Sequence, residues 1–219
     1  MSKPRLLDLF CGAGGAGMGY SRAGFEVVGV DIKPQRHYPF EFHQADALEF
    51  LREHGHEFDA IHASPPCQAY TISGMNARRD GIEYPDLVAA TRELLEATGK
   101  PWVIENVPGA PIRADFTLCG CQFGIKQLRR SRLFETSWHG FEMMKPCCHT
   151  EPAISVVGHG TTSWTKKRLG RNVSVEEKRS LMGIDWMNRE QLAQAIPPCY
   201  TEFIGRRLLA EVQGEELSA

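Results

Sequence analysis

A short apolar run that leads directly into a glycine-rich turn constrains the fold of this chain most. The run spans residues 5–10, and Gly12, Gly14, Gly15 and Gly17 follow it. Glycine lets the backbone turn tightly and approach a ligand without a Cβ atom in the way. In α/β proteins such a turn joins the first buried strand of a parallel sheet to a helix, beside a bound nucleotide. The stretch therefore predicts an α/β protein with a nucleotide-like cofactor at its first turn.

Apolar runs of similar length recur along the first half of the chain and alternate with helical patterns. The runs are Phe25 to Asp31, Phe58 to Ala63 and Trp102 to Val107. The clearest helical pattern is Asp86 to Thr98, and another lies at Cys199 to Val212. Short continuous apolar runs are typical of strands buried on both faces of a parallel sheet. The alternation predicts a mostly parallel, twisted sheet with helices on both faces.

The pattern divides the 219 residues into three parts. We expect residues 1–136 to form a catalytic and cofactor-binding domain. Residues 137–173 are rich in Gly, Ser, Thr and His and lack clear periodicity, so they predict a small insertion. Residues 174–219 begin at Ser174 with the spacing of a helix N-cap and are expected to complete the first domain with helices.

Composition excludes several classes of protein. No apolar run approaches the length of a membrane span, and the first residues do not resemble a signal peptide. The seven cysteines form an odd count, which favours reduced thiols over a disulfide framework. We therefore expect a cytoplasmic protein with no membrane partner. The net charge is −2, yet residues 125–182 hold eleven Lys and Arg against five Asp and Glu. This basic zone suits a phosphate backbone, although an ordinary solvated surface has the same composition.

Cys67 directly follows the third apolar run, within Pro65-Pro66-Cys67-Gln68. Each proline fixes its own φ and restricts the residue before it, so the thiol is held at the carboxyl end of a strand. An open α/β sheet places its chemistry at this edge. Cys67 is therefore a candidate nucleophile. The alternative interpretation is a small buried apolar residue, the commonest environment of a free cysteine.

Two further motifs carry charged groups toward the same edge. Glu105 ends the fourth apolar run, and a carboxyl group in an apolar pocket can keep its proton near neutral pH and donate it. A salt-bridged strand end is the alternative. Arg130 and Arg132 alternate in a strand-like segment and so share a face, where their guanidinium groups could hold a carbonyl, a phosphate or the acid. A basic edge strand would look the same.

One carboxylate at the end of the second apolar run and another after the apolar pair Phe40 and Phe42 suggest cofactor contacts. Asp31 lies 19 residues after Gly12, where an acid that binds ribose hydroxyl groups belongs. On these residues alone, an NAD-dependent oxidoreductase remains open. Asp46 could accept a hydrogen bond from an adenine amino group, or it could be the N-cap of a helix that begins at Ala47.

Together, these segments resemble the DNA (cytosine-5) methyltransferases, and the likeness follows the family's order along nearly the whole chain. The segments that carry it are Asp8-x-Phe10-x-Gly12-x-Gly14-Gly15, Pro65-Pro66-Cys67-Gln68, Glu105-Asn106-Val107, Arg130-x-Arg132, and Leu181 to Ile184 with Gln194 to Pro198. The chain departs from the family at Leu128 and Gln194, where glutamine and asparagine are expected. The compact insertion suggests a phage or prokaryotic type, acting in a prokaryotic cell or a phage-infected host.

The resemblance implies a Rossmann-like methyltransferase fold with S-adenosylmethionine as cofactor and a small target-recognition insertion. The implied cofactor contacts are Phe10, Gly12, Gly14, Gly15, Asp31, Ile32, Asp46, Ala47 and Pro66. The implied catalytic residues are Cys67, Glu105, Arg130 and Arg132.

The implied reaction is methylation of cytosine C5 in double-stranded DNA, by a monomer that flips the base out of the duplex. Candidate DNA contacts are Gln68, Ser73, Arg78, Arg79, His159, Lys166, Lys167 and Arg168. RNA cytosine methylation and a catalytically idle nucleic-acid-binding relative remain alternatives. Cys119, Cys121, Cys147, Cys148 and His149 invite a zinc interpretation, but their spacing is unlike C-x₂-C, so we expect ordinary thiols and no metal.

Overall fold

A seven-stranded sheet organises the part of the chain that the structure describes, with strand order β3-β2-β1-β4-β5-β7-β6. The structure is a computed structural model, and it describes residues 2–70, 80, 85–138, 144–157 and 160–215. The strands are β1 (Arg5–Leu9), β2 (Glu26–Asp31), β3 (Glu41–Gln44), β4 (Ala60–Ala63), β5 (Trp102–Asn106), β6 (Phe116–Leu118) and β7 (Arg132–Thr136). Strands β1 to β5 are parallel, and β7 runs antiparallel to both of its neighbours. The predicted mostly parallel sheet is confirmed.

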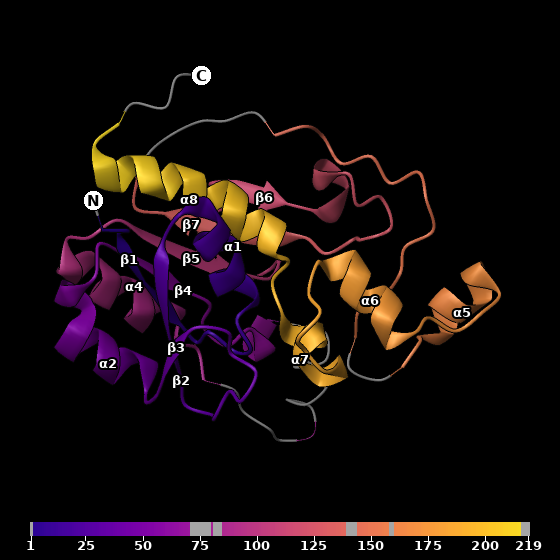
Figure 1. The fold of residues 1–219 in the computed structure, drawn as a ribbon. Coiled ribbons are helices and arrows are strands. Elements are labelled where there is room, and N and C mark those ends of the chain that lie inside the picture. The colour runs from indigo at the N-terminus through magenta and orange to yellow at the C-terminus, as the bar shows by residue number, and fades with distance from the viewer. Residues whose placement is uncertain (1, 71–79, 81–84, 139–143, 158–159, 216–219) are drawn as a thin grey trace.

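Helices cover both faces of this sheet (Figure 1). The α-helices are α1 (Gly15–Ala23), α2 (Ala47–His54), α4 (Val88–Thr98), α5 (Ser163–Leu169), α6 (Val175–Met182), α7 (Arg189–Gln194) and α8 (Pro198–Gln213). Short 3-10 helices are η1 (Gly55–Glu57), η2 (Gln68–Tyr70) and η3 (Gly120–Phe123). Helices α1 and α8 pack against each other on one face, and α2 and α4 lie together on the other.

Alternating side chains of each strand supply the two cores. Leu6 and Val27 point to the face that Tyr20, Tyr200 and Ile204 of α1 and α8 cover. Their neighbours on the same strands point to the opposite face, where the residues that α2 and α4 contribute are Ala47, Leu51 and Leu95. This alternation explains why the strands read as continuous apolar runs, because both faces are buried.

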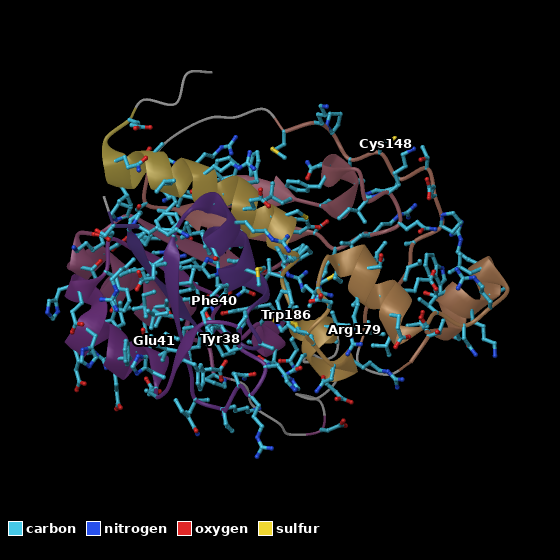
Figure 2. The ribbon with its side chains drawn as sticks, in the orientation of Figure 1. Tyr38, Phe40, Glu41, Cys148, Arg179 and Trp186 are labelled. Atoms are coloured by element: carbon cyan, nitrogen blue, oxygen red, sulfur yellow. The ribbon has the colours of Figure 1, made fainter. Side chains whose placement is uncertain are left out.

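A third apolar cluster joins the carboxyl-terminal helices to the glycine-rich turn. It contains Ala13, Leu128, Met182, Ile184, Met187 and Leu192, all nearly inaccessible to solvent. The indole Nε1 of Trp186 donates a hydrogen bond of 2.8 Å to the carbonyl of Ala13, and Figure 2 shows Trp186 beside α7. Gly15 lies so close to this segment that a Cβ atom there would come within 2.6 Å of the Ile196 carbonyl oxygen. The segment 181–198 therefore returns to the first turn of the sheet.

The segment that we expected to lack periodicity contains one helix that sequence reasoning missed. Helix α5 is seven residues long, begins after Thr162, whose hydroxyl accepts from the Thr165 amide, and ends at Gly170 in the left-handed conformation. Figure 1 places it at the end of the molecule farthest from β1. None of the helices in the described ranges is both long and apolar enough to cross a membrane.

Candidate active site

The carboxyl ends of four neighbouring parallel strands form one edge of the sheet, and the candidate residues lie there. Leu9 at the end of β1 is paired with Val30 of β2 and with Ala63 of β4, and Ala63 is paired with Ile104 of β5. The glycine-rich turn, Asp31, Cys67 and Glu105 each follow or end one of these strands. The register therefore brings together motifs that are as much as 93 residues apart in the chain, from Gly12 to Glu105.

The turn after β1 forms a cradle that is open at Gly12 and closed at Gly14, where a Cβ atom would come within 2.7 Å of Cδ of Pro39. Phe10, Gly12 and Gly14 all have positive φ, of 56°, 50° and 84°. Nothing lies within 4 Å of the position where a Cβ atom of Gly12 would be. The amide of Gly12 donates a 3.0 Å hydrogen bond to Oδ2 of Asp31, which fixes the turn against the end of β2. Phe10 is partly buried against the core formed by α2 and α4.

The predicted cofactor contacts that follow this cradle in the chain differ in how much of each side chain is exposed. Ile32 is a large apolar side chain with 65% of its surface exposed, directly after the Asp31 carboxylate. Asp46 is also exposed, and its Oδ1 accepts hydrogen bonds from the amides of Leu48 and Glu49 as the N-cap of α2. The N-cap interpretation of Asp46 is therefore confirmed, while an adenine contact remains a prediction. Ala47 is buried in the first turn of α2.

Cys67 lies in the turn between β4 and η2. Its carbonyl accepts from the amide of Tyr70, and the Asn106 side chain donates a 3.0 Å hydrogen bond to the carbonyl of Pro65. Asn106 also accepts from the amide of Val107, so it ties the cysteine turn to the end of β5. Sequence reasoning had quoted Asn106 only as part of a motif. Pro66 is half-buried, and Gln68 is exposed at the start of η2.

Electrostatic forces on the Cys67 thiol act in both directions. Burial raises the pKa of the Cys67 thiol, and the negative charge of Glu105 raises it further, while Arg132 and Arg130 lower it. The four groups are thus close enough to influence one another. The thiol form is favoured in this state, and added positive charge or loss of the Glu105 charge would favour the thiolate.

Glu105 is almost completely buried, with 5% of its surface exposed. Burial raises the pKa of its carboxyl group, and Arg132, a hydrogen bond from Ser64 and Arg130 oppose that rise. Nε of Arg132 lies 2.9 Å from Oε1 of Glu105. This Oε1 nevertheless has no aligned hydrogen-bond donor among the described residues. The carboxyl group is therefore held by charge and by Ser64, with one oxygen left to make a further hydrogen bond.

A buried chain of polar groups leads away from Ser64. Its hydroxyl lies 2.9 Å from Nε2 of His62, and Nδ1 of His62 lies 2.9 Å from the hydroxyl of Tyr20. Burial lowers the pKa of His62 to about 3, so the ring is neutral. Neither His62 nor Tyr20 was singled out from the sequence, since each alone reads as an ordinary core residue.

The two arginines have different partners, which corrects the expectation that they share one strand face. Strand β7 begins at Arg132, so Arg130 precedes it. The Arg130 guanidinium donates to the carbonyls of Ala193, Ala195 and Val156, at 2.6, 3.1 and 3.2 Å. Burial lowers its pKa to about 9. Arg130 therefore holds the carboxyl-terminal segment in place, whereas Arg132 reaches Glu105.

The candidate nucleic-acid contacts are only partly described. Ser73, Arg78, Arg79 and His159 lie outside the described residues. Lys166, Lys167 and Arg168 are exposed on α5, and the Arg168 guanidinium lies 5.0 Å from the ring centre of Trp164. Trp164 is itself 46% exposed, and sequence reasoning overlooked it. An exposed indole beside three cations is the kind of surface that binds bases and phosphates.

Comparison with solved structures defines the class of fold. The chain resembles the structure of the Entamoeba histolytica methyltransferase EhMeth with a TM-score of 0.61 over 99% of this chain and 100% of that one, at 14% identity. This likeness is one of fold. The predicted Rossmann-like methyltransferase fold is thereby confirmed.

Sequence comparison then identifies the family. Residues 4–111 match the C-5 cytosine-specific DNA methylase family. The chain is 30% identical over 120 residues to the Type II methyltransferase M.HgiDI of Herpetosiphon aurantiacus, covering 48% of this chain and 38% of that protein. It is 28% identical over 211 residues to the Type II methyltransferase M1.HphI of Haemophilus parahaemolyticus, and the match covers 76% of this chain and 54% of that protein. These matches place residues 4–111 of the chain in the C-5 cytosine-specific DNA methylase family. The chain spans only about a third of the length of the first relatives that it matches, between 30% and 38%.

Proposed function

We propose that this protein transfers a methyl group from S-adenosylmethionine to C5 of a cytosine in double-stranded DNA. The observation that carries the proposal is the convergence of Cys67, Glu105 and Arg132 at the edge of the sheet that also bears the glycine cradle. An NAD-dependent oxidoreductase has no use for these three groups together. The family match of residues 4–111 supports the same reaction.

The residues of the cradle suit the cofactor. The space above Gly12 admits a ligand close to the backbone, and the Asp31 carboxylate can accept hydrogen bonds from ribose hydroxyl groups. The exposed Ile32 side chain offers an apolar face for an adenine ring. When bound, S-adenosylmethionine supplies an electrophilic methyl group. Phe10 and Asp46 remain predicted contacts of the same cofactor.

Cys67 and Glu105 would activate the cytosine ring. C5 of cytosine is too weak a nucleophile to take a methyl group unaided, so the Cys67 sulfur adds to C6 while Glu105 gives a proton to N3. The raised pKa of Glu105 favours the protonated form that this step needs. Its Oε1, which lacks an aligned donor among the described groups, is the oxygen available to face the base. C5 then takes the methyl group. Its proton passes to a base, the C6–S bond breaks to release the Cys67 thiolate, and the N3 proton returns to Glu105.

The remaining groups would position the base and the duplex. Arg132 lies where it can share its charge between Glu105 and a carbonyl oxygen of the base. Because C6 is hidden in a stacked duplex, the cytosine must be flipped out, at a cost of a few kcal/mol. The exposed cations of α5 and Trp164 would offset that cost through phosphate and base contacts.

The test is transfer of a labelled methyl group to duplex DNA, followed by base-resolution sequencing. We expect label at cytosine C5 with the wild-type protein and none with Cys67→Ala, whose cofactor binding is measured separately by calorimetry. A parallel reaction with RNA addresses the nearest alternative within the same chemistry. Methyl transfer to RNA alone would show that the substrate is RNA and not DNA. Cofactor binding without transfer to either polymer would indicate a catalytically idle nucleic-acid-binding protein.

A further inference from the structure

Four metal-ligating side chains converge beside β6, the outermost strand of the sheet. They are Cys119, Cys121, Cys147 and His149, and their ligand atoms all lie within 4.8 Å of one another. Cys119 directly follows the edge strand β6, and Cys121 belongs to the 3-10 helix η3. Cys147 and His149 come from an exposed segment without regular structure. The sequence spacing, which led us to expect ordinary thiols, concealed this cluster because its two halves are 26 residues apart.

The geometry is close to that of a tetrahedral metal centre. A Zn–S bond of about 2.3 Å places two thiolates of a tetrahedral site about 3.8 Å apart. In the structure, Sγ of Cys119 already lies 4.0 Å from Nε2 of His149. Cys147 and His149 are exposed, so rotation of their side chains meets little resistance from packing. Three sulfurs and one imidazole nitrogen are a ligand set typical of structural zinc.

Close backbone packing and hydrogen bonds hold the two segments of the cluster near each other. Gly120, between the first two cysteines, has no space for a side chain, since a Cβ atom there would come within 2.6 Å of the Leu128 carbonyl oxygen. The amide of Cys119 donates to Oε1 of Gln122, and Nε2 of Gln122 donates to the carbonyl of Lys145. Gln122 therefore links the turn that carries the first pair to the segment that carries the second.

The second segment has little else to hold it. Residues 145–150 are all exposed and belong to no helix or strand, so they gain little from apolar burial. Nη2 of Arg129 donates to the carbonyls of His149 and Glu151, at 3.1 and 3.4 Å. Three thiolates and a neutral imidazole around a divalent ion leave a net negative charge, which the Arg129 cation offsets. Cys148 is not part of the cluster, and Figure 2 shows it on the outer side of this segment.

We propose that Cys119, Cys121, Cys147 and His149 bind one structural Zn²⁺ ion that fastens residues 145–151 to the sheet edge beside β6. All four positions of the tetrahedron are filled by protein, so the site has no open position for catalysis. The ion stabilises the start of the expected insertion, because a site of this kind converts binding free energy into folding free energy. The imidazole distinguishes this arrangement from a disulfide, which would join two of the sulfurs and leave His149 without a role.

The test measures metal content in the whole chain, purified under reducing conditions with a tag that contains no histidine. We expect one zinc per chain by plasma mass spectrometry in the wild-type protein. Cys147→Ser and His149→Ala should lose it, and both side chains are exposed, so their replacement spares the core. Cys148→Ser is the matched control and should keep the full amount. Cobalt substitution should give the intense visible bands of a tetrahedral thiolate site in the wild-type protein and not in Cys147→Ser.

Three results would overturn the proposal. The first is a folded wild-type protein that holds no stoichiometric zinc after reconstitution with Zn²⁺. The second is equal metal loss in Cys148→Ser and Cys147→Ser. The third is a metal-free native protein whose intact mass is lower by two hydrogens, since that would show a disulfide among the sulfurs. Because none of these measurements uses methyl transfer, their outcome is independent of the proposed activity.

Discussion

Nε2 of His62 lies 2.9 Å from the hydroxyl oxygen of Ser64, and this contact joins a buried hydrogen-bond chain to Glu105. The Tyr20 hydroxyl can donate to Nδ1 of the neutral ring, the ring can donate from Nε2 to Ser64, and Ser64 then donates to Glu105. Every donor in this order has an acceptor. The chain therefore helps to orient the Glu105 carboxyl group, together with Arg132.

The first prediction concerns the end of this chain. Ser64→Ala removes a hydrogen bond to a carboxyl group, an interaction worth about 1.5–3 kcal/mol, so we expect kcat for methyl transfer to fall by about tenfold or more. The KM values for DNA and cofactor should change little, because the proposed role of Ser64 is to position Glu105. Tyr20→Phe leaves the contact between Ser64 and Glu105 in place and should cost less. A rise in KM without a change in kcat would contradict this role.

The second prediction concerns the pH dependence of stability. The pKa of His62 is about 3 in the folded protein, against an ordinary value of 6.5, so the unfolded state binds the extra proton between these values. The contribution of His62 to the free energy of unfolding therefore falls as pH falls through that window, by about 2 kcal/mol between pH 7 and pH 5. Asp8, buried with a pKa of about 7, acts in the opposite direction over the same range.

The difference between two proteins separates these effects. Relative to the wild-type protein, His62→Gln should gain about 2 kcal/mol in unfolding free energy on going from pH 7 to pH 5. Urea denaturation at both pH values measures this, with the Asp8 carboxyl group present in both proteins. Parallel curves for the two proteins would show that His62 takes up a proton in the folded state as readily as in the unfolded one.

A third prediction concerns the reactivity of Cys67. The Glu105 charge helps to raise the pKa of the Cys67 thiol, so Glu105→Gln should move the pH midpoint of Cys67 alkylation downward. Loss of the Arg132 cation, as in Arg132→Met, should move it upward. Iodoacetamide labelling across a pH series, read by peptide mass spectrometry, separates Cys67 from the exposed Cys148. Shifts of the opposite sign would contradict the electrostatic account.

The two arginines should respond differently to substitution. Arg130→Met leaves three partly buried carbonyl groups without their donor, and we expect it to lower the unfolding free energy by about 3 kcal/mol. Arg132→Lys keeps a cation near Glu105 and should affect turnover more than stability. Denaturation curves and single-turnover rates for both variants test this contrast. Equal stability losses would indicate that the two residues have the same role.

The fifth prediction concerns α5. Replacing Lys166 and Lys167 by glutamine should weaken DNA binding and reduce the dependence of log K on log salt by about 2, as two phosphate contacts are lost. Trp164→Ala should weaken binding without changing that dependence. Fluorescence anisotropy with labelled duplex across a salt series measures both. An unchanged affinity in the double lysine variant would remove α5 from the DNA surface.

The sequence predicted most of the sheet because burial on both faces leaves a simple signature. The four apolar runs became β1, β2, β4 and β5 within two residues at each end. Short elements whose partners are remote left no such signature. Helix α5 is only seven residues long, and its boundaries at Thr162 and Gly170 are visible only once a helix is assumed.

For the candidate site, motif spacing located the groups that lie at the end of a strand. It could not find contacts between residues that are far apart in the sequence. The contact of His62 with Tyr20 joins residues 42 apart, and that of Arg130 with Ala195 joins residues 65 apart. The same limit concealed the cysteine and histidine cluster, since pairing across 26 residues depends on where the backbone turns. The contacts of Arg130 with Ala193 and Val156 were hidden for the same reason, while its catalytic role stays a prediction.

The packing of α8 on α1 has a consequence for the order in which the molecule can be completed during synthesis. Gly19 in α1 lies so close to α8 that a Cβ atom would meet the Thr201 hydroxyl oxygen and the Pro198 carbonyl. The strands that precede α8 emerge from the ribosome with the part of one apolar face that α1 does not cover exposed until residues 198–213 follow. A nascent chain that stalls before that point keeps an exposed apolar surface of the kind that chaperones bind.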